Sequence, residues 1–286
     1  MKTAVLLGAG GLGCPAALAL AEEKAGIRLV IVDPDRVERS NLARQILYGE
    51  ADIGAPKAEI AARRTGAEAR VARFEAATTN ELLEDADVLL DGTDDFETRF
   101  FANDEAVRRG IPLVHGAALG WSGQLLTVLP GRTACLRCLF ESPPDAAPTC
   151  AEAGVLAPLC GLVGAAMARA ALAVLRGQPE AGVLHRWDAR TGAYRPLSLK
   201  RDPACAACTP ASASPASVPL RPERRSILLS AGPVSPVQGA SRRNSSCQAG
   251  SSTTSRPQPL AARYRAAQRA ARPRPCTWND AARTLS

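Results

Sequence analysis

A glycine-rich turn near the start of the chain constrains the fold more than any other feature. The turn, Gly8–Gly13, reads Gly-Ala-Gly-Gly-Leu-Gly. It follows a short apolar run, Thr3–Leu7, and precedes a stretch of helical composition, Cys14–Lys24. Glycines allow a strand to turn sharply into a helix, and the free N–H groups at the start of the helix suit a phosphate. The turn therefore favours a nucleotide site over a turn that serves packing alone.

An acidic residue follows the second expected strand, Arg28–Val32. Asp33 lies 20 residues after Gly13, where a carboxylate can accept hydrogen bonds from ribose hydroxyls. No P-loop lysine follows the glycines, so Arg44 and Lys57 become the candidates for neutralising phosphates, although each alone would be an ordinary surface cation. These residues do not separate ATP from a dinucleotide.

The rest of the chain alternates between strand and helix patterns as far as residue 118. The expected helices are Ala55–Arg64 and Thr98–Arg109, and the expected strands are Ala69–Phe74, Asp87–Asp91 and Pro112–Ala118. The later elements are a strand at Gln124–Leu129, a long apolar helix at Gly154–Leu175 and a hairpin of Val183–Trp187 with Tyr194–Leu199. This order predicts an α/β fold: a Rossmann-like, mostly parallel sheet with helices on both faces and an antiparallel extension.

Composition separates a body, residues 1–208, from a tail, residues 209–286. The formal net charge of the 286-residue chain is +7. The tail holds 12 arginines, no lysine and two acids, whereas the body holds 23 basic and 26 acidic residues. We expect the Pro-, Ser-, Ala- and Arg-rich tail to be disordered, since it can bury little apolar surface. The acidic body and an aromatic content of 4% argue against a nucleic-acid-binding function.

The ends and the apolar runs of the chain indicate a cytoplasmic protein. No uninterrupted run of about 18 apolar residues occurs, so no membrane span is expected. The N-terminal apolar run ends at Gly8, which is too short for a signal peptide.

Two Cys-x-x-C pairs form the most specific metal pattern in the sequence. Cys135 with Cys138 and Cys205 with Cys208 are separated by 66 residues. Four thiolates can bind structural zinc in a closed tetrahedron, so we expect a zinc knuckle that joins the late hairpin to the body. A disulfide pair and a redox pair are the alternatives; the first is unusual in a cytoplasmic protein, and the second needs one pair only.

Three further sets of residues carry weaker signals. Gly92-Thr93-Asp94-Asp95 follows the strand at 87–91, and a carboxylate there could hold Mg²⁺ beside bound phosphates or belong to an ordinary acidic turn. Cys150 precedes the long helix and is either a reactive thiol or a packing residue. The cysteines at 14 and 160 and the histidines at 115 and 185 are expected in the core.

Together these motifs resemble the ubiquitin-activating-enzyme-like family, in its MoeB/ThiF/HesA branch of molybdopterin-synthase and thiamine sulfur-carrier adenylyltransferases. The motifs that carry the resemblance are Gly8–Gly13, Asp33, Ser40–Gln45, Gly54–Lys57, Thr93–Asp95, Cys135–Cys138, Cys150–Leu156 and Cys205–Cys208. The resemblance implies an enzyme that adenylates the C-terminal glycine of a small β-grasp sulfur carrier ending in Gly-Gly, with release of pyrophosphate.

The resemblance also implies roles for particular residues. Gly8, Gly10, Gly11 and Gly13 would form the ATP loop, Asp33 would bind the ribose, and Asn41, Arg44 and Lys57 would face the phosphates. Asp94 would hold Mg²⁺, and the four knuckle cysteines would bind Zn²⁺. Asp95 stands where the family usually has asparagine. Cys150 matches a cysteine that the thiamine branch links covalently to the carrier through sulfur.

The same resemblance implies a homodimer and a sulfur donor such as a cysteine desulfurase or a rhodanese. Family members usually carry an N-terminal helical segment with an arginine that reaches the partner's ATP; here the chain starts almost at the first strand, so we expect a truncated start or a weakened site. The alternatives are a tRNA-modifying dehydratase of the same superfamily, an NAD(P)-dependent oxidoreductase, which leaves the four cysteines unexplained, and a degenerate copy without turnover.

Overall fold

The computed structural model describes residues 1–23, 26–140 and 154–208. The chain divides into two units between residues 214 and 215. Every residue described below belongs to the first unit.

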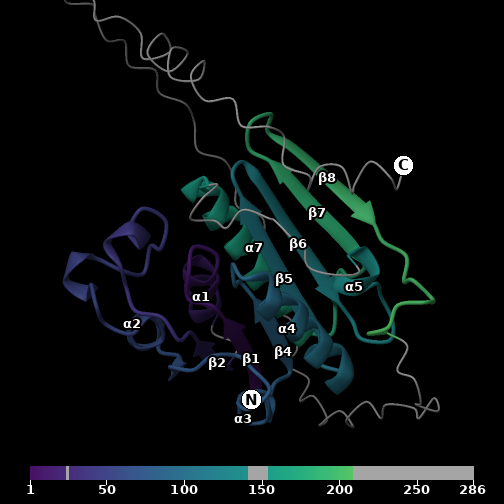
Figure 1. Cartoon of the computed structure of the whole chain (residues 1–286), viewed down its shortest axis with the longest axis horizontal. Helices are drawn as coiled ribbons and strands as arrows, with labels where there is room; N and C mark the ends of the chain where they lie inside the picture. Colours follow the sequence, from purple (N-terminus) through teal and green to yellow (C-terminus); the bar gives the residue numbers. More distant parts are fainter. Residues whose placement is uncertain (24–25, 141–153, 209–286) are drawn as a thin grey trace, which may run out of the picture. The chain divides into compact units, whose positions relative to one another are not determined.

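One eight-stranded sheet forms the centre of this unit, in the order β3-β2-β1-β4-β5-β6-β7-β8 (Figure 1). The strands are β1 (Lys2–Leu7), β2 (Ile27–Val32), β3 (Glu68–Arg70), β4 (Val88–Asp91), β5 (Leu113–Leu119), β6 (Ser122–Val128), β7 (Val183–Asp188) and β8 (Ala193–Ser198). Strands β1 to β5 run parallel, whereas β6, β7 and β8 add antiparallel pairs at the β5 edge. The chain reverses direction across the sheet between β1 and β4, which is where open α/β sheets bind ligands.

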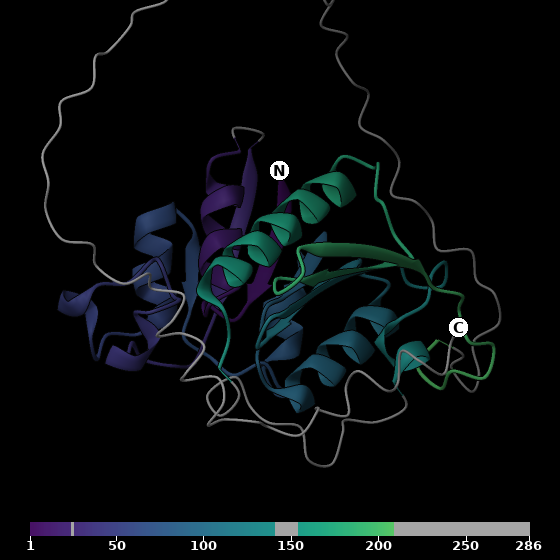
Figure 2. The same cartoon turned by 90° about the horizontal axis from the view of Figure 1, so that it is seen from above.

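Helices cover both faces of the sheet (Figure 2). The longer ones are α1 (Gly13–Ala21), α2 (Lys57–Thr65), α4 (Phe96–Arg109) and α7 (Ala157–Leu175), and the short ones are α3 (Thr79–Leu83) and α5 (Leu136–Leu139). Helices α1, α2 and α7 bury residues in one hydrophobic cluster, and α3 and α4 contribute to a second cluster on the opposite face. The predicted fold class is confirmed.

Several element boundaries differ from the sequence prediction. The third strand ends at Arg70 and not at Phe74; Phe74 turns into the core and contacts the ring of Phe101. The prediction missed α3 and α5, which have five and four residues and are too short to show a helical period. Helices α2 and α4 end at glycines in the left-handed conformation, Gly66 and Gly110, a common way to terminate a helix.

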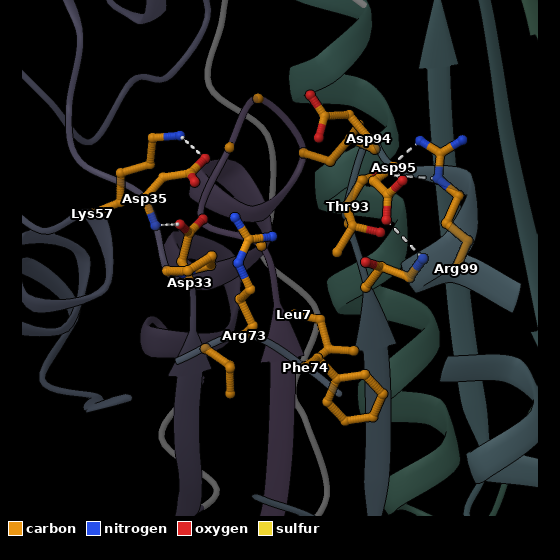
Figure 3. Close-up of a pocket in the computed structure, with 18 of the residues that line it drawn as sticks. Leu7, Asp33, Asp35, Lys57, Arg73, Phe74, Thr93, Asp94, Asp95 and Arg99 are labelled. Carbon is orange, nitrogen blue, oxygen red and sulfur yellow. Dashed lines mark hydrogen bonds and ion pairs between the residues drawn. The ribbon is translucent and has the colours of Figure 1, made fainter. Parts of the chain in front are cut away.

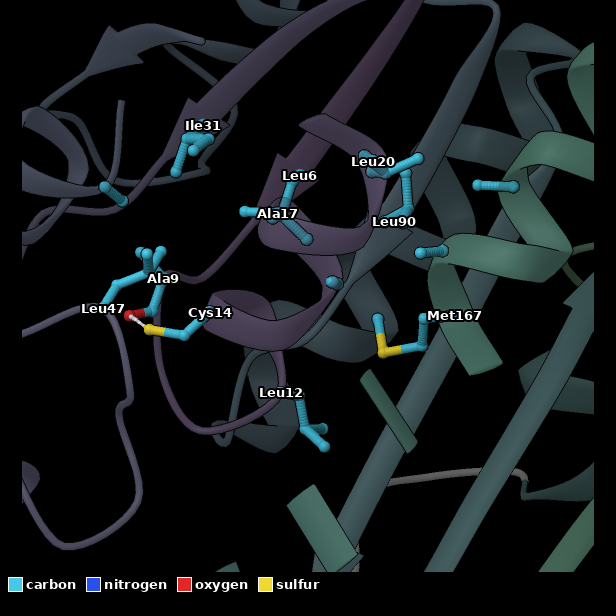
Figure 4. Close-up of a cluster of buried hydrophobic side chains, with 14 of the residues drawn as sticks. Leu6, Ala9, Leu12, Cys14, Ala17, Leu20, Ile31, Leu47, Leu90 and Met167 are labelled. Carbon is cyan, nitrogen blue, oxygen red and sulfur yellow. Dashed lines mark hydrogen bonds between the residues drawn. The ribbon is translucent and has the colours of Figure 1, made fainter. Parts of the chain in front are cut away.

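Helix α7 packs closely because it offers small residues to its neighbours. A Cβ on Gly164 would lie 2.4 Å from the Leu12 carbonyl oxygen, so only glycine allows α1 to approach this closely. Met167 fills the space above Gly116 of β5 and belongs to the cluster around Leu6 and Leu90 (Figure 4).

One helix bears on the expectation about membrane spans. Helix α7 is long and apolar enough to cross a membrane by length and composition, with a mean hydropathy of 1.8. The sequence analysis predicted this apolar helix but did not count it as a span, because Arg169 interrupts the apolar run. Since α7 packs on α1, β5 and β6, we interpret it as a core helix.

Candidate active site

A cavity of about 510 Å³ opens at the carboxyl ends of β1, β2 and β4. The loops after β1 and β4 touch there, because a Cβ on Gly8 would lie 3.1 Å from the Gly92 carbonyl oxygen. Of the residues predicted for the site, those that line the cavity are Gly8, Gly10, Gly11, Asp33, Arg44, Lys57, Asp94 and Asp95. The structure thus brings together residues that span almost 90 positions of the sequence (Figure 3).

The glycine turn takes a shape that other residues could not adopt. Gly8 has a φ of +82°, in the left-handed region that favours glycine. A Cβ on Gly13 would lie 1.8 Å from the Gly8 carbonyl oxygen. Gly13 is not among the cavity-lining residues, so its visible contribution is the close approach of α1 to the turn.

Asp33 ties the glycine turn to the end of β2. Its carboxylate accepts hydrogen bonds from the backbone N–H of Ala9 at 2.6 Å and of Asp35 at 2.8 Å. Burial raises the pKa of Asp33, and the Ala9 N–H and the nearby Lys57 ammonium partly offset this effect. The carboxylate therefore faces the cavity in a fixed orientation.

Two cations reach the same cavity from the segment between β2 and α2. Lys57, the first residue of α2, is 7% exposed and pairs with Asp35 at 2.8 Å. Arg44 is half-buried and donates one bond of 3.3 Å to the Ser40 carbonyl oxygen. Both line the cavity together with the glycine turn, so their charges are available to an anion.

Asn41 lies outside the lining of the cavity, although the resemblance implied a phosphate contact. Its Oδ1 accepts a bond from the Glu38 N–H at 3.2 Å, and its Nδ2 donates to the Ser40 Oγ at 3.3 Å. It closes the short 3-10 turn η1 (Arg39–Asn41). A direct role at the phosphates remains a prediction.

The two acidic residues after β4 have different surroundings. Asp95 caps α4: its carboxylate accepts bonds from the Thr98 N–H at 2.7 Å and the Glu97 N–H at 3.3 Å. The carboxylate of Asp94 makes no hydrogen bond or ion pair with the described residues and lines the cavity. The free oxygens of Asp94 suit a Mg²⁺ ion beside phosphates.

Asp91 and His115 form a buried pair, which the sequence analysis missed, and this pair supports the turn after β4. Asp91 is fully buried and lies 2.7 Å from the Nδ1 of His115, while its other oxygen accepts bonds from the N–H and Oγ1 of Thr93. Arg99 donates two bonds to the Thr93 carbonyl oxygen. Burial alone would raise the pKa of Asp91, but the bond from His115 and the charges of His115 and Arg99 hold it below its ordinary value.

The four cysteines of the predicted knuckle converge on one point. Their Sγ atoms all lie within 4.8 Å of one another. The Sγ–Sγ distances are 3.9 Å for Cys135–Cys138, 3.7 Å for Cys135–Cys205 and 3.7 Å for Cys138–Cys208. A tetrahedral zinc site with Zn–S distances of about 2.3 Å separates its sulfurs by about 3.8 Å, whereas a disulfide brings them to about 2 Å. The residues therefore fit a zinc ion.

The other cysteines divide into three cases. Cys14 is buried, donates to the Ala9 carbonyl oxygen, and has its pKa raised to about 11 by burial, which makes it a poor nucleophile. Cys160 was expected in the core alone; it is buried but also lines the cavity, with its Sγ 3.2 Å from the position of a Cβ on Gly11. Cys150 lies outside the described residues.

Other cavity residues carried little or no sequence signal. Asp35, Gln45, Arg73 and Phe74 line the cavity, and Figure 3 shows Arg73 near Asp33. Gln45 belongs to the Ser40–Gln45 motif, but no pattern marked its side chain as part of the site. Arg73 comes from the segment that the sequence analysis assigned to a strand.

The cavity, the glycine turn and the order of the strands define an open α/β protein with a cavity at the point where the strand order reverses. Residues 2–207 match the ThiF family, and the chain belongs to this family. The sulfur carrier protein adenylyltransferase of Thermus thermophilus is 42% identical over 220 residues, which cover 71% of this chain and 81% of that protein. The sulfur carrier protein ThiS adenylyltransferase of Escherichia coli is 36% identical over 220 residues and covers 74% of this chain and 87% of its own length.

Solved structures share the fold. The E. coli protein MccB, crystallised with ATP, superposes with a TM-score of 0.63 over 73% of this chain and 66% of its own. Its sequence identity is 20%, so this similarity concerns the fold alone.

Proposed function

We propose that this protein is an ATP-dependent adenylyltransferase that activates the C-terminal glycine of a small ubiquitin-like sulfur carrier protein ending in Gly-Gly. The observation that carries the proposal is the similarity to adenylyltransferases named for sulfur carriers, at 36–42% identity over more than two thirds of both chains. The cavity supports it, because glycine N–H groups, two cations and a free carboxylate face one space.

In the proposed reaction, an oxygen of the carrier's terminal carboxylate attacks the α-phosphorus of ATP. A new O–P bond forms, the bond between the α-phosphorus and its bridging oxygen breaks, and pyrophosphate leaves with the electron pair. The attacking carboxylate is ionised at neutral pH, so the reaction needs no general base. Alignment and charge stabilisation are then the main contributions of the protein.

The residues that line the cavity have separate roles in the proposed reaction. Asp33 binds the ribose, while the N–H groups of Gly10 and Gly11 hold the phosphate nearest to it. Arg44 and Lys57 neutralise charge on the phosphates and on the departing pyrophosphate. Asp94 holds Mg²⁺, which supplies further charge neutralisation when it is bound. The pair of Asp35 with Lys57 at 2.8 Å orients the ammonium.

The four cysteines bind a structural zinc ion in this proposal. The cluster ties the segment of α5 to the segment after β8 and lies apart from the residues that line the cavity. Its four ligands are all protein thiolates, which leaves no position for a substrate.

The biological setting belongs to the same proposal. The carrier serves thiamine or molybdopterin synthesis, the protein works in the cytoplasm as a homodimer, and a cysteine desulfurase or a rhodanese supplies sulfur. Residues 1–208 carry the activity, and residues 209–286 are dispensable for it.

The test is ATP–pyrophosphate exchange with purified protein, with and without a carrier that ends in Gly-Gly. The full chain and a chain ending at residue 208 should both exchange label, and only with the carrier present. A carrier that lacks its last glycine is the matched negative control. Bound ATP without any exchange would contradict the proposed activity and indicate a degenerate copy.

A further inference from the structure

The carboxamide of Gln45 is a polar group buried beside the cavity without a partner. Gln45 is 4% exposed, and its Oε1 is fully buried with no hydrogen bond. Its Nε2 makes no hydrogen bond within the described part of the chain either. Buried side-chain amides are nearly always bonded, since leaving one unpaired destabilises the fold. Nε2 is not among the fully buried unsatisfied atoms, and Gln45 lines the cavity, so the unpaired NH₂ is the part of the amide that a ligand can reach.

The position of Gln45 limits which part of a nucleotide can be that ligand. Its Nε2 lies 3.8 Å from where a Cβ on Gly10 would be, so the carboxamide faces the glycine turn. Asp33, the proposed ribose-binding residue, accepts a hydrogen bond from the N–H of Ala9. The proposed ribose site therefore lies beside Ala9, the residue that precedes Gly10. The phosphate attached directly to the ribose is the α-phosphate, so this group falls next to Gly10.

The chemistry of the amide matches that group. Phosphate oxygens only accept hydrogen bonds, and the NH₂ of glutamine donates two. The NH₂ already faces the glycine turn, so the contact needs no rotation of the carboxamide. The NH₂ of Gln45 is an uncharged donor. It can bond the α-phosphate while Arg44 and Lys57 stabilise the negative charge of the departing pyrophosphate.

We propose that Gln45 binds the α-phosphate of the nucleotide and keeps this bond in the adenylate after pyrophosphate has left. The inference rests on the proposed function and adds a residue to the reacting centre. The bond uses the NH₂ of Gln45; the fully buried Oε1 is an acceptor, as phosphate oxygens are, and gains no partner from this contact.

The experiment compares Gln45→Met, which keeps the length of the side chain and removes its polar atoms, with Gln178→Met, a control at an exposed position. Binding of ATP, AMP and adenosine is measured by calorimetry, and Tm is measured without ligand. AMP contains the α-phosphate alone, and adenosine contains no phosphate. Gln45→Leu is a second apolar replacement in case the methionine variant does not fold.

We expect Gln45→Met to weaken ATP and AMP binding about tenfold to a hundredfold, as for the loss of a hydrogen bond to a charged group. Adenosine binding should stay the same, and the Tm of the free protein should equal or exceed that of the wild type. The exchange rate should fall with ATP affinity, and Gln178→Met should change none of these quantities.

Three results would overturn the inference. Unchanged ATP and AMP binding with a lower Tm would make Gln45 a packing residue. An equal loss for ATP, AMP and adenosine would place its contact on the nucleoside. A wild-type protein that binds no ATP would overturn the proposed function, and this inference with it.

Discussion

Lys57 combines burial, charge and access to the cavity in one side chain. Its side chain is 8% exposed and its ammonium pairs with Asp35, so both the stem and the charge are held by the fold. A substitution here tests the phosphate site directly.

Lys57→Ala should lower carrier-dependent pyrophosphate exchange by about a hundredfold or more, because one preorganised donor at a developing charge contributes that much. Its zinc content should match the wild type. Arg39→Ala is a suitable control, since Arg39 is an exposed cation from the same segment that pairs with Glu50. Full exchange by the Lys57 variant would remove this residue from the phosphate site.

The pair of Asp91 and His115 should contribute to stability more than to binding. Asp91→Asn should lower the free energy of unfolding, measured with urea, by about 3 kcal/mol, because it disrupts the buried hydrogen bonds of the carboxylate with His115 and Thr93. Glu50→Gln, which weakens an exposed pair with Arg39, should cost less than about 1 kcal/mol. A variant at Asp91 as stable as the wild type would contradict this account.

The difference in stability between the wild type and Asp91→Asn should change with pH in one direction. The pKa of Asp91 lies below its ordinary value in the folded protein, despite burial, because of His115 and Arg99. A depressed carboxyl pKa adds stability at neutral pH, and this stability is lost as the pH falls through the folded value. The difference in the free energy of unfolding between wild type and Asp91→Asn should therefore be largest near neutral pH and shrink as the pH falls below about 4.

At the scale of elements, the start of α4 gives two neighbouring carboxylates, Asp94 and Asp95, different roles. Asp95→Ala should cost about 1 kcal/mol of stability, because it removes the cap that bonds the N–H groups of Glu97 and Thr98. Asp94→Ala should leave stability unchanged but lower exchange about a hundredfold, since its free carboxylate is the proposed Mg²⁺ ligand. Each variant is the other's control, measured by urea unfolding and by exchange.

The opposite result would reverse these assignments. Lost stability in the Asp94 variant with normal exchange would mean that the carboxylate has a structural partner. Lost exchange in the Asp95 variant, corrected for the folded fraction, would extend the metal or phosphate site to Asp95.

At the scale of the molecule, the cysteine cluster joins segments that are distant in the sequence. Cys205→Ser should reduce bound zinc from about one ion per chain to well below that and lower Tm by several degrees, because structural zinc contributes folding energy. Metal analysis and thermal unfolding measure both effects. Cys247→Ser, outside both pairs, is the control, and a stable, metal-loaded Cys205 variant would refute the four-cysteine assignment.

Local patterns were enough to predict the order of the elements. The glycine turn after an apolar run, the alternation of strands and helices, and the two Cys-x-x-C pairs depend on backbone conformation and residue chemistry within a few positions. They predicted the parallel sheet, its antiparallel extension and four cysteines that the structure brings within 4.8 Å. The resemblance to a family added the expected site residues, eight of which line one cavity.

Contacts between distant segments were not predictable in the same way. The local pattern did not separate Asp94 from Asp95, and only the resemblance assigned Mg²⁺ to Asp94. The fold makes Asp95 the cap of α4 and leaves Asp94 free. The partner of Asp91 comes from β5, and Cys160 reaches the cavity because α7 packs over the glycine turn. The sequence by itself determined which chemical groups are present and which elements hold them, because these follow from local preferences. The tertiary structure decided which groups are paired and which stay free, as for Gln45, since that depends on the neighbours that folding supplies.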